Sequence, residues 1–445
     1  MRPRIVESSI LRCDRRTVSP RSVFLAVTLA FAVLTPRDGL AQSWEKLRPT
    51  TAAAPAARYN ATAIFDDYAR NIVIFGGRNS DGNFNDVWCF NLDTLIWREI
   101  TPADTIQPAK RFGHDAVYDP IGRNMLVWSG QGTAFFNDLW AFHLPSHEWT
   151  QLKPPGPLPS PRYGSASVYD PVSRQLVMFS GFTDVGRFDD TQAYDIATNT
   201  WIDVTPPGAN PVARCLHTAC FDSGRHRMII YGGQRSGPLD DIWAFDLAAR
   251  TWSDLTPAAR PSGRIFPSSV CHNDQVFVFG GRTTEGNVDE LLSFDLRQNE
   301  WNVLQPAGPH PESRSAHAAV SLGDGAMIIF GGLGDSALND LWRSFDEHLD
   351  VSEPPSASLS FGLLQNYPNP FNSTTTITFR IAETARTRLQ IFDLLGREIS
   401  TILDEELAPG AYSRTFDARN TPSGVYAYRL QSGSTIQIRT FILIR

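Results

Sequence analysis

The sequence lacks the features that mark several large classes of protein. Its 40 basic residues are outnumbered by 47 acidic ones, and the resulting net charge of −7 gives no reason to expect a nucleic-acid partner. It contains no phosphate-binding glycine loop, no nucleophile elbow and no paired cysteine motif that would hold a metal. We therefore expect no catalytic residue, no metal and no cofactor.

Long apolar runs are also missing. The apolar stretch Val23–Leu34 has twelve residues, whereas a membrane-spanning helix needs about 20. It follows an arginine-rich segment and precedes small residues at Gly39 and Ala41, an order typical of a secretory signal peptide. We predict that residues 1–41 are a signal peptide and that the mature chain has no transmembrane segment.

Turn-forming and aromatic residues, in contrast, are plentiful. The 445 residues include 32 Gly and 31 Pro, together with 27 Phe, 11 Trp and 11 Tyr. Such a mixture predicts many short strands joined by turns, and the length suffices for two or three domains.

A repeat with a period of about 50 residues runs from residue 44 to residue 346. Each copy opens with an arginine, continues with an apolar run that ends in Gly-Gly or Ser-Gly, and then has an acidic residue. The opening arginines are Arg58, Arg111, Arg162, Arg214, Arg264 and Arg314. The acidic residues are Asp86, Asp138, Asp190, Asp241, Glu290 and Asp340. A tryptophan closes each of the first five copies, at Trp97, Trp149, Trp201, Trp252 and Trp301.

Each copy is expected to form four short strands. Runs such as Ile72–Phe75 do not alternate with polar residues, which predicts a strand buried on both faces. The sixth copy has no closing tryptophan, but Trp44–Leu47 matches Trp97–Ile100. We therefore expect the N-terminal strand to complete the last sheet and leave no open edge.

These features resemble kelch repeats, whose marks are the double glycine and the spaced tryptophans. The resemblance implies an all-β fold, a six-bladed propeller of the galactose oxidase-like kelch superfamily over residues 42–348, closed by the N-terminal strand. Two copies depart from the pattern because Gln192 and Leu292 replace a tryptophan that four copies carry.

The C-terminal part has a different character. Residues 349–362 form a linker rich in proline and serine, and residues 363–445 contain strand-like runs such as Thr376–Phe379, Leu389–Phe392 and Val425–Tyr428. Several motifs there resemble type IX secretion C-terminal sorting domains: residues 366–372, 393–398, 409–412, 423–426 and 441–445. The resemblance implies a small immunoglobulin-like β-sandwich that engages the type IX secretion machinery, and a secreted or cell-surface protein.

The loops of the repeat are the candidate binding site. Connections between the second and third strands, and between successive copies, should emerge on one face, whereas short turns such as 119–122 lie on the other. Variable loops on a rigid scaffold usually carry recognition. Candidate ligand-binding residues there are Arg78, Phe84, Gln131, Phe135, Phe136, Thr183, Arg187, Phe188, Gln234, Arg235, Arg282 and Glu285. The phenylalanines have an alternative role, in which they pack beneath their loops.

The repeated charged residues, the histidines and the cysteines have mainly structural explanations. The repeated arginines and acids suit ion pairs within or between neighbouring copies. His114, His217 and His317 recur in alternate copies, and a shared metal would require their nitrogens within ~2.1 Å of one ion, so we favour a structural role. The sequence does not decide whether the remaining cysteines are buried free thiols or form disulfides: Cys89, Cys215, Cys220 and Cys271.

The preferred hypothesis is a secreted or cell-surface module that binds a protein or a carbohydrate. The alternative is a sugar-active enzyme, because kelch propellers include galactose oxidases and sialic acid mutarotases. Fold alone does not decide between them.

Overall fold

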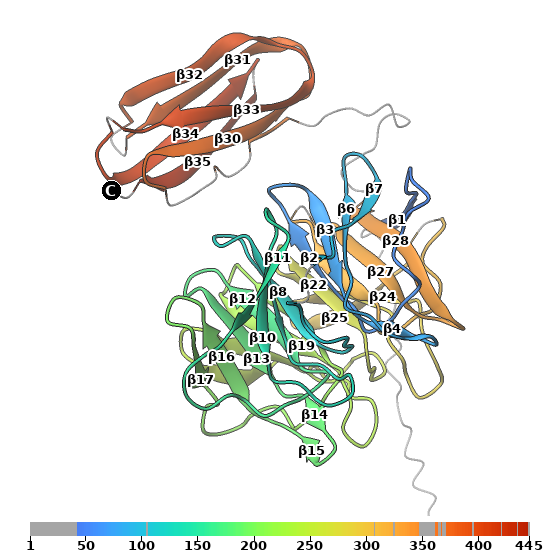
Figure 1. Cartoon of the computed structure of the whole chain (residues 1–445). Helices are drawn as coiled ribbons and strands as arrows, with labels where there is room; N and C mark the ends of the chain where they lie inside the picture. Colours follow the sequence, from blue (N-terminus) through green and yellow to red (C-terminus); the bar gives the residue numbers. More distant parts are fainter. Residues whose placement is uncertain are drawn as a thin grey trace, which may run out of the picture.

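The computed structural model describes residues 42–346 except 104–105, 307 and 324, and residues 361–443 except 364–365, 367–370, 394–395, 420 and 434. Every named element of these ranges is a β-strand (Figure 1). The predicted signal peptide and most of the predicted linker lie outside the described residues. Within the described part, no helix is long and apolar enough to cross a membrane.

Residues 42–346 form six four-stranded antiparallel sheets, the number of copies in the repeat. The first contains β2 (Thr62–Asp66), β3 (Asn71–Phe75), β6 (Val87–Asn91) and β7 (Ile96–Glu99). The second and third contain β8 (Asp115–Asp119), β9 (Asn124–Trp128), β10 (Leu139–His143) and β11 (Glu148–Leu152), then β12 (Ala166–Asp170), β13 (Gln175–Phe179), β16 (Thr191–Asp195) and β17 (Thr200–Asp203). The fourth and fifth contain β18 (Thr218–Asp222), β19 (Arg227–Tyr231), β20 (Ile242–Asp246) and β21 (Thr251–Asp254), then β22 (Ser268–His272), β23 (Gln275–Phe279), β24 (Leu291–Asp295) and β25 (Glu300–Leu304).

The sixth sheet joins the two ends of the repeat. It contains β26 (Ala318–Ser321), β27 (Met327–Leu333), β28 (Ala337–Asp346) and the N-terminal strand β1 (Gln42–Leu47). β1 pairs antiparallel with β28, and Trp44 lies opposite Ser344. The predicted completion of the last sheet by the N-terminal strand is confirmed.

A closed cycle of backbone hydrogen bonds links the six sheets at the start of their innermost strands. The N–H of Asn60 donates to the carbonyl of Ala316 at 2.8 Å, and each further bond runs from one sheet to the preceding one until the cycle returns to Asn60. Its six members are Asn60, Gly113, Gly164, Leu216, Phe266 and Ala316, and all have φ between 53° and 68°. At Gly113 the left-handed conformation coincides with a close approach, because a Cβ there would lie 2.3 Å from the ring of Tyr163.

Aromatic rings fill the spaces between neighbouring sheets. Trp149 packs against Phe75 of the preceding sheet with ring centroids 4.9 Å apart, and Trp44 packs in the same way against Phe279 at 5.0 Å. The remaining pairs are Trp97–Phe330, Trp201–Trp128, Trp252–Phe179 and Trp301–Tyr231. The closing tryptophan of each copy is thus an apolar plate between two sheets, as predicted.

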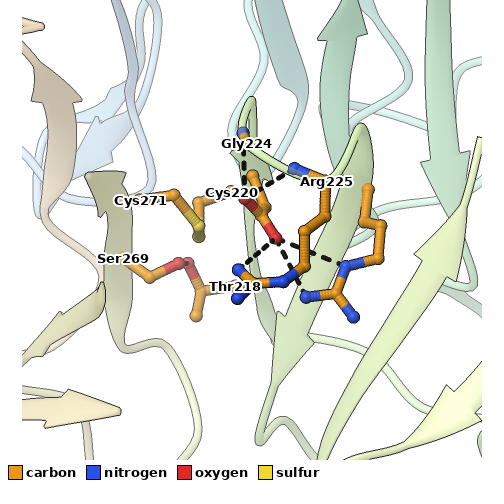
Figure 2. Close-up of a disulfide and its surroundings, with 8 residues drawn as sticks. Thr218, Cys220, Gly224, Arg225, Ser269 and Cys271 are labelled. Atoms are coloured by element: carbon orange, nitrogen blue, oxygen red, sulfur yellow. Dashed lines mark hydrogen bonds and ion pairs between the residues drawn. A yellow bond between two sulfur atoms is a disulfide. The ribbon is translucent and has the colours of Figure 1, made fainter. Parts of the chain in front are cut away.

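A disulfide between Cys220 and Cys271 joins the innermost strands of the fourth and fifth sheets, β18 and β22 (Figure 2). The two Cα atoms are 5.6 Å apart, and the hydroxyls of Thr218 and Ser269 bond beside them at 2.8 Å. The sequence left this pairing open because its two members are 51 residues apart. The other two described cysteines, Cys89 and Cys215, are buried free thiols.

The C-terminal part consists of two sheets around one core. A three-stranded sheet contains β29 (Gly362–Leu363), β30 (Thr374–Ile381) and β33 (Gly410–Asp417). A four-stranded sheet contains β31 (Ala385–Phe392), β32 (Glu398–Leu407), β34 (Gly424–Ser432) and β35 (Thr435–Leu443). Ile377, Ile391, Tyr428 and Phe441 are among the fully buried residues between them. All three strand-like runs predicted for this region fall within these strands.

Candidate functional site

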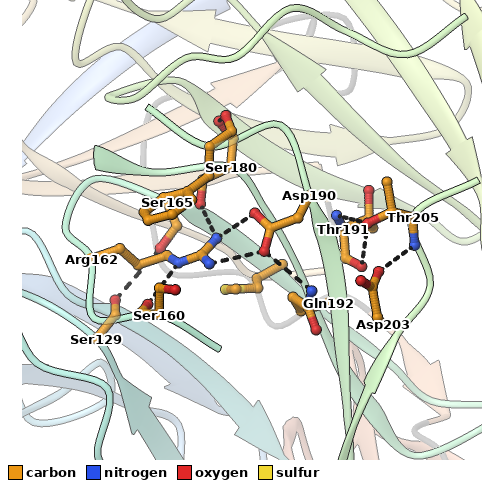
Figure 3. A network of polar contacts seen from close by, with 12 residues as sticks. Ser129, Ser160, Arg162, Ser165, Ser180, Asp190, Thr191, Gln192, Asp203 and Thr205 are labelled. Atoms are coloured by element: carbon orange, nitrogen blue, oxygen red, sulfur yellow. Dashed lines mark hydrogen bonds and ion pairs between the residues drawn. The ribbon is translucent and has the colours of Figure 1, made fainter. Parts of the chain in front are cut away.

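Arginines anchor the loops of every sheet, and Figure 3 shows one of them, Arg162. Its side chain is 1% exposed. One terminal nitrogen donates to the carbonyl of Ser180 at 2.8 Å and to Asp190 at 2.6 Å, while the other donates to Asp190 at 2.9 Å. Its Nε donates to the carbonyl of Ser160. This guanidinium therefore ties the start of the copy to both ends of the loop between its second and third strands.

The same anchor recurs in all six sheets. The pairs are Arg58–Asp86, Arg111–Asp138, Arg162–Asp190, Arg214–Asp241, Arg264–Glu290 and Arg314–Asp340, each within one copy. Burial raises the pKa of Asp138, but the hydrogen bonds and positive charge of Arg111, together with hydrogen bonds from Trp140 and the backbone, outweigh burial and lower it. The ion pairs suggested by the repeated arginines and acids are thus present in all six copies, each within its own copy.

A second donor explains one departure from the repeat. In four copies a tryptophan two residues after the acid donates its indole N–H to the same carboxylate, as Trp140 does to Asp138 at 2.7 Å. In the third copy Gln192 occupies this position and donates its amide to Asp190 at 3.1 Å. Gln192 therefore replaces the hydrogen bond of the tryptophan, although not its ring.

Three of the candidate phenylalanines stack against these buried arginines. Phe84, Phe136 and Phe188 lie under the guanidiniums of Arg58, Arg111 and Arg162, with the guanidinium carbon 4.2, 4.4 and 4.0 Å from the ring centre. Such stacking favours the packing alternative for these rings.

The predicted geometry of the loops is also present. The loop that follows β3 contacts the connection from β7 to β8, because Arg111 N donates to Phe84 O and Asn85 Nδ2 donates to Pro108 O. We call the side with these connections the loop face. On the opposite side the turn after β8 closes on itself, since buried Asp119 accepts the N–H groups of Ile121 and Gly122.

Six side chains from the first three sheets gather on the loop face. We call them the arginine–aromatic patch: Arg78, Phe112, Phe135, Tyr163, Phe182 and Arg187. Arg78 belongs to β4 (Arg78–Asn79), which pairs with β5 (Gly82–Asn83), and Arg187 belongs to β15 (Gly186–Arg187), which pairs with β14 (Phe182–Thr183).

Rings of the patch lie against one another and beneath the two arginines. The guanidinium carbon of Arg78 is 4.5 Å from the centre of the Phe112 ring, and that of Arg187 is 5.4 Å from the centre of the Phe182 ring. Phe135, Tyr163 and Phe182 form a triangle with ring centroids 6.1–6.4 Å apart, and buried Phe112 lies 5.7 Å from Tyr163. The patch is thus a cluster of packed rings, three of them partly exposed, with two arginines stacked against it.

Neither arginine of the patch is neutralised. Among the described residues, no carboxylate lies within ion-pair distance of Arg78 or Arg187, and the buried Nε atom of each has no hydrogen-bond partner. The partners beside Arg187 are uncharged: the Cys215 thiol and the amide oxygen of Gln234, to which it donates a long bond of 3.4 Å. Burial and the neighbouring thiol of Cys215 raise the pKa of Tyr163 to about 12 although both guanidiniums lower it, so its hydroxyl stays protonated.

The candidate residues not yet described lie outside this patch, in loops of the second to fifth copies. Thr183 is buried and accepts the N–H of Val185, and Gln131 pairs through its backbone with Phe112. Arg235, Arg282 and Glu285 are exposed. Sequence analysis missed Phe112, Tyr163 and Phe182, although each occupies a repeat position that could have been read: directly after the opening arginine or after the small pair.

The three histidines line one cavity of about 110 Å³ at the loop-face end of the central channel. Two of them bond to a hydroxyl of the preceding sheet: His114 Nε2 is 2.8 Å from Thr62 Oγ1, and His317 Nε2 is 2.5 Å from Ser268 Oγ. Their imidazoles therefore link neighbouring sheets.

His217 differs because the corresponding position on its preceding sheet is Ala166. Neither ring nitrogen of His217 has a partner in the described part of the protein. Burial, helped by nearby Arg214, lowers the pKa of His217 to about 3, so the ring is neutral at ordinary pH. No three or more His, Cys, Asp or Glu side chains of the described residues are arranged to hold a metal.

Comparison with known proteins adds two family matches. A model described as the KLHDC2/KLHL20/DRC7 Kelch-repeats domain matches residues 34–215, 82–259 and 172–347 in overlapping placements. A model described as the secretion system C-terminal sorting domain matches residues 365–445.

Curated relatives match the repeat region at low identity. Multiple epidermal growth factor-like domains protein 8 of Mus musculus is 26% identical over 68% of this chain and 12% of its own length. Host cell factor homolog hcf-1 of Caenorhabditis elegans is 27% identical over 54% of this chain and 33% of its own length, and kelch domain-containing protein 3 of Homo sapiens is 27% identical over 63% and 80%. The chain thus spans a minor part of the first two relatives.

Proposed function

This chain belongs to the kelch-repeat family and ends in a secretion system C-terminal sorting domain, and on that premise we propose that it is an exported binding module. We interpret its six sheets as the blades of a closed propeller, and its C-terminal part as an immunoglobulin-like sandwich that serves export. The loop face of the propeller binds a protein or carbohydrate ligand at the cell surface or outside the cell. The role is binding, not catalysis.

The arginine–aromatic patch is the observation that carries this proposal. Six other arginines on the same face are buried against acidic partners, whereas Arg78 and Arg187 have none among the described residues. Uncompensated cations beside partly exposed aromatic rings are typical of recognition surfaces, where arginine and aromatic residues are enriched.

The binding role is tested by screening the purified protein on arrays of cell-surface proteins and of glycans. Replacement of both Phe135 and Arg187 by Ala should abolish retention of the captured ligand while the melting temperature stays unchanged. Ile121→Ala, which alters an exposed side chain of the opposite face, is the matched control and should bind normally. If the Ile121 variant alone loses the ligand, binding takes place on the other face.

Export is tested separately. We propose that residues 1–41 direct passage into the periplasm and that residues 363–445 direct the type IX step. Because the propeller closes through β1 and β28 without the C-terminal part, deletion of residues 363–445 should leave a folded propeller in the periplasm. Normal amounts of the truncated protein at the cell surface would contradict the sorting role.

A further inference from the structure

The chemistry of the arginine–aromatic patch restricts its ligand. Arg78 and Arg187 can only donate hydrogen bonds, and the protonated Tyr163 hydroxyl near both of them is a further donor. Because Gln234 accepts from Arg187 through its amide oxygen, its amide N–H groups remain as donors. A ligand for this surface must therefore be rich in hydrogen-bond acceptors. The two guanidiniums without an acidic partner favour a ligand that carries negative charge.

The shape of the patch restricts the ligand further. All six side chains lie outside four cavities of about 110 to 530 Å³ that the described residues form, and all but Phe112 are partly exposed, so a ligand reaches the patch from open solvent. A peptide usually gains its affinity from side chains inserted into pockets. A sugar ring, in contrast, lays an apolar C–H face on an aromatic ring while its edge carries polar groups. The partly exposed Phe135, packed against Phe182 and Tyr163, offers such a ring.

We propose that the arginine–aromatic patch binds an acidic polysaccharide, in which uronic acid units stack on Phe135 and their carboxylates bond to Arg78 and Arg187. A uronic acid combines the two required features, since its carboxylate projects from the ring that stacks. The inference rests on the proposed binding function of the loop face and names the class of ligand.

Isothermal titration of the full secreted chain with hexagalacturonate tests this inference. Binding should weaken with added salt, and a neutral galactose hexamer should bind at least tenfold more weakly. Arg187→Ala and Arg78→Ala should each reduce affinity for hexagalacturonate about tenfold or more. Arg250→Ala removes an exposed arginine of the turn between β20 and β21, outside the patch, and should leave affinity unchanged.

A hexaglutamate peptide of equal charge distinguishes the classes of ligand. Tight binding of the peptide with no binding of hexagalacturonate overturns the polysaccharide inference but leaves the loop-face function in place. An equal loss of hexagalacturonate affinity in the Arg250 variant also overturns it, because attraction would then follow net charge and not the patch. Array capture that is insensitive to Phe135 and Arg187, in contrast, would reject the proposed binding function itself.

Melting curves of every variant, with Arg187→Gln as a second replacement, exclude unfolding as the cause of lost affinity.

Discussion

Two sets of arginines on the loop side of the propeller have opposite environments. The six anchors are buried and each bonds to an acidic side chain of its own sheet, whereas Arg78 and Arg187 lie over aromatic rings with no acidic partner among the described residues. The third copy of the repeat contains one of each kind, Arg162 and Arg187.

This difference separates charges that build the fold from charges that are available to a ligand. An anchor repeats in every copy because every sheet must hold its long loop against the next. A patch arginine occurs in a loop whose composition changes from copy to copy. An arginine that recurs in every copy with an acidic partner therefore has a structural role. An arginine in a variable loop without an acidic partner is available to a ligand.

The largest expected effect follows from removing the acid of an anchor. Asp138→Ala leaves the fully buried Arg111 without its counter-ion, which should cost about 3–5 kcal/mol of unfolding free energy in urea titrations. Asp81→Ala, at an exposed loop position, is the control and should change stability by less than about 0.5 kcal/mol. Similar losses in both variants would show that the anchors have no special role.

A comparable loss should follow from opening the ring of sheets. Trp44 is 4% exposed and packs against Phe279, so Trp44→Ala should cost about 3 kcal/mol. Val185→Ala, at a side chain that is 89% exposed, is the control for the same measurement. A melting temperature of the Trp44 variant equal to that of the control would contradict closure by the N-terminal strand.

The disulfide between Cys220 and Cys271 should stabilise the folded state, although it is not part of the repeat pattern. It closes a segment of 51 residues, for which chain entropy predicts about 4 kcal/mol, and measured values are usually about 2–4 kcal/mol. Replacing both Cys220 and Cys271 by Ser should lower the urea midpoint accordingly. Cys89→Ser, at a free thiol, should have a smaller effect, and dithiothreitol should destabilise the native protein but not the double variant.

A smaller effect is expected at Asp115, an interior carboxylate that no arginine bonds to. Burial raises the pKa of Asp115 to about 6, although hydroxyls of Ser165 and Ser167 donate to it. The folded state therefore holds this proton more tightly than the unfolded state, and stability falls as pH rises from about 4 to 6. Asp115→Asn should raise the unfolding free energy on the order of 2 kcal/mol at pH 7 and little at pH 4. An equal gain at both pH values would reject the assigned titration.

Much of the fold could be predicted because it follows from residues within one copy. The apolar run before the small pair gave the buried second strand, and the tryptophan spacing gave the pairing of β1 with β28. Ion pairs such as Arg58–Asp86 also join residues of one copy.

Two features that depend on contact between neighbouring copies could not be predicted, although the packing of the tryptophans between sheets was. The disulfide pairs Cys220 with Cys271 across two sheets, and the hydrogen-bond cycle gives Leu216 and Phe266 a left-handed backbone that no local signal indicates. The patch was found in part: Arg78, Phe135 and Arg187 were candidates because they lie in long loops, whereas Tyr163 was missed because it lies at the start of an inner strand.

The pair Arg162→Ala and Arg187→Ala tests the distinction between structural and available arginines most directly, because both residues belong to the third copy of the repeat. Urea unfolding of the two variants should give a loss of about 3–5 kcal/mol for Arg162→Ala, which leaves Asp190 without its partner, and a change within about 0.5 kcal/mol for Arg187→Ala. Equal losses in the two variants would contradict the account, because Arg187 would then be as structural as the anchor beside it.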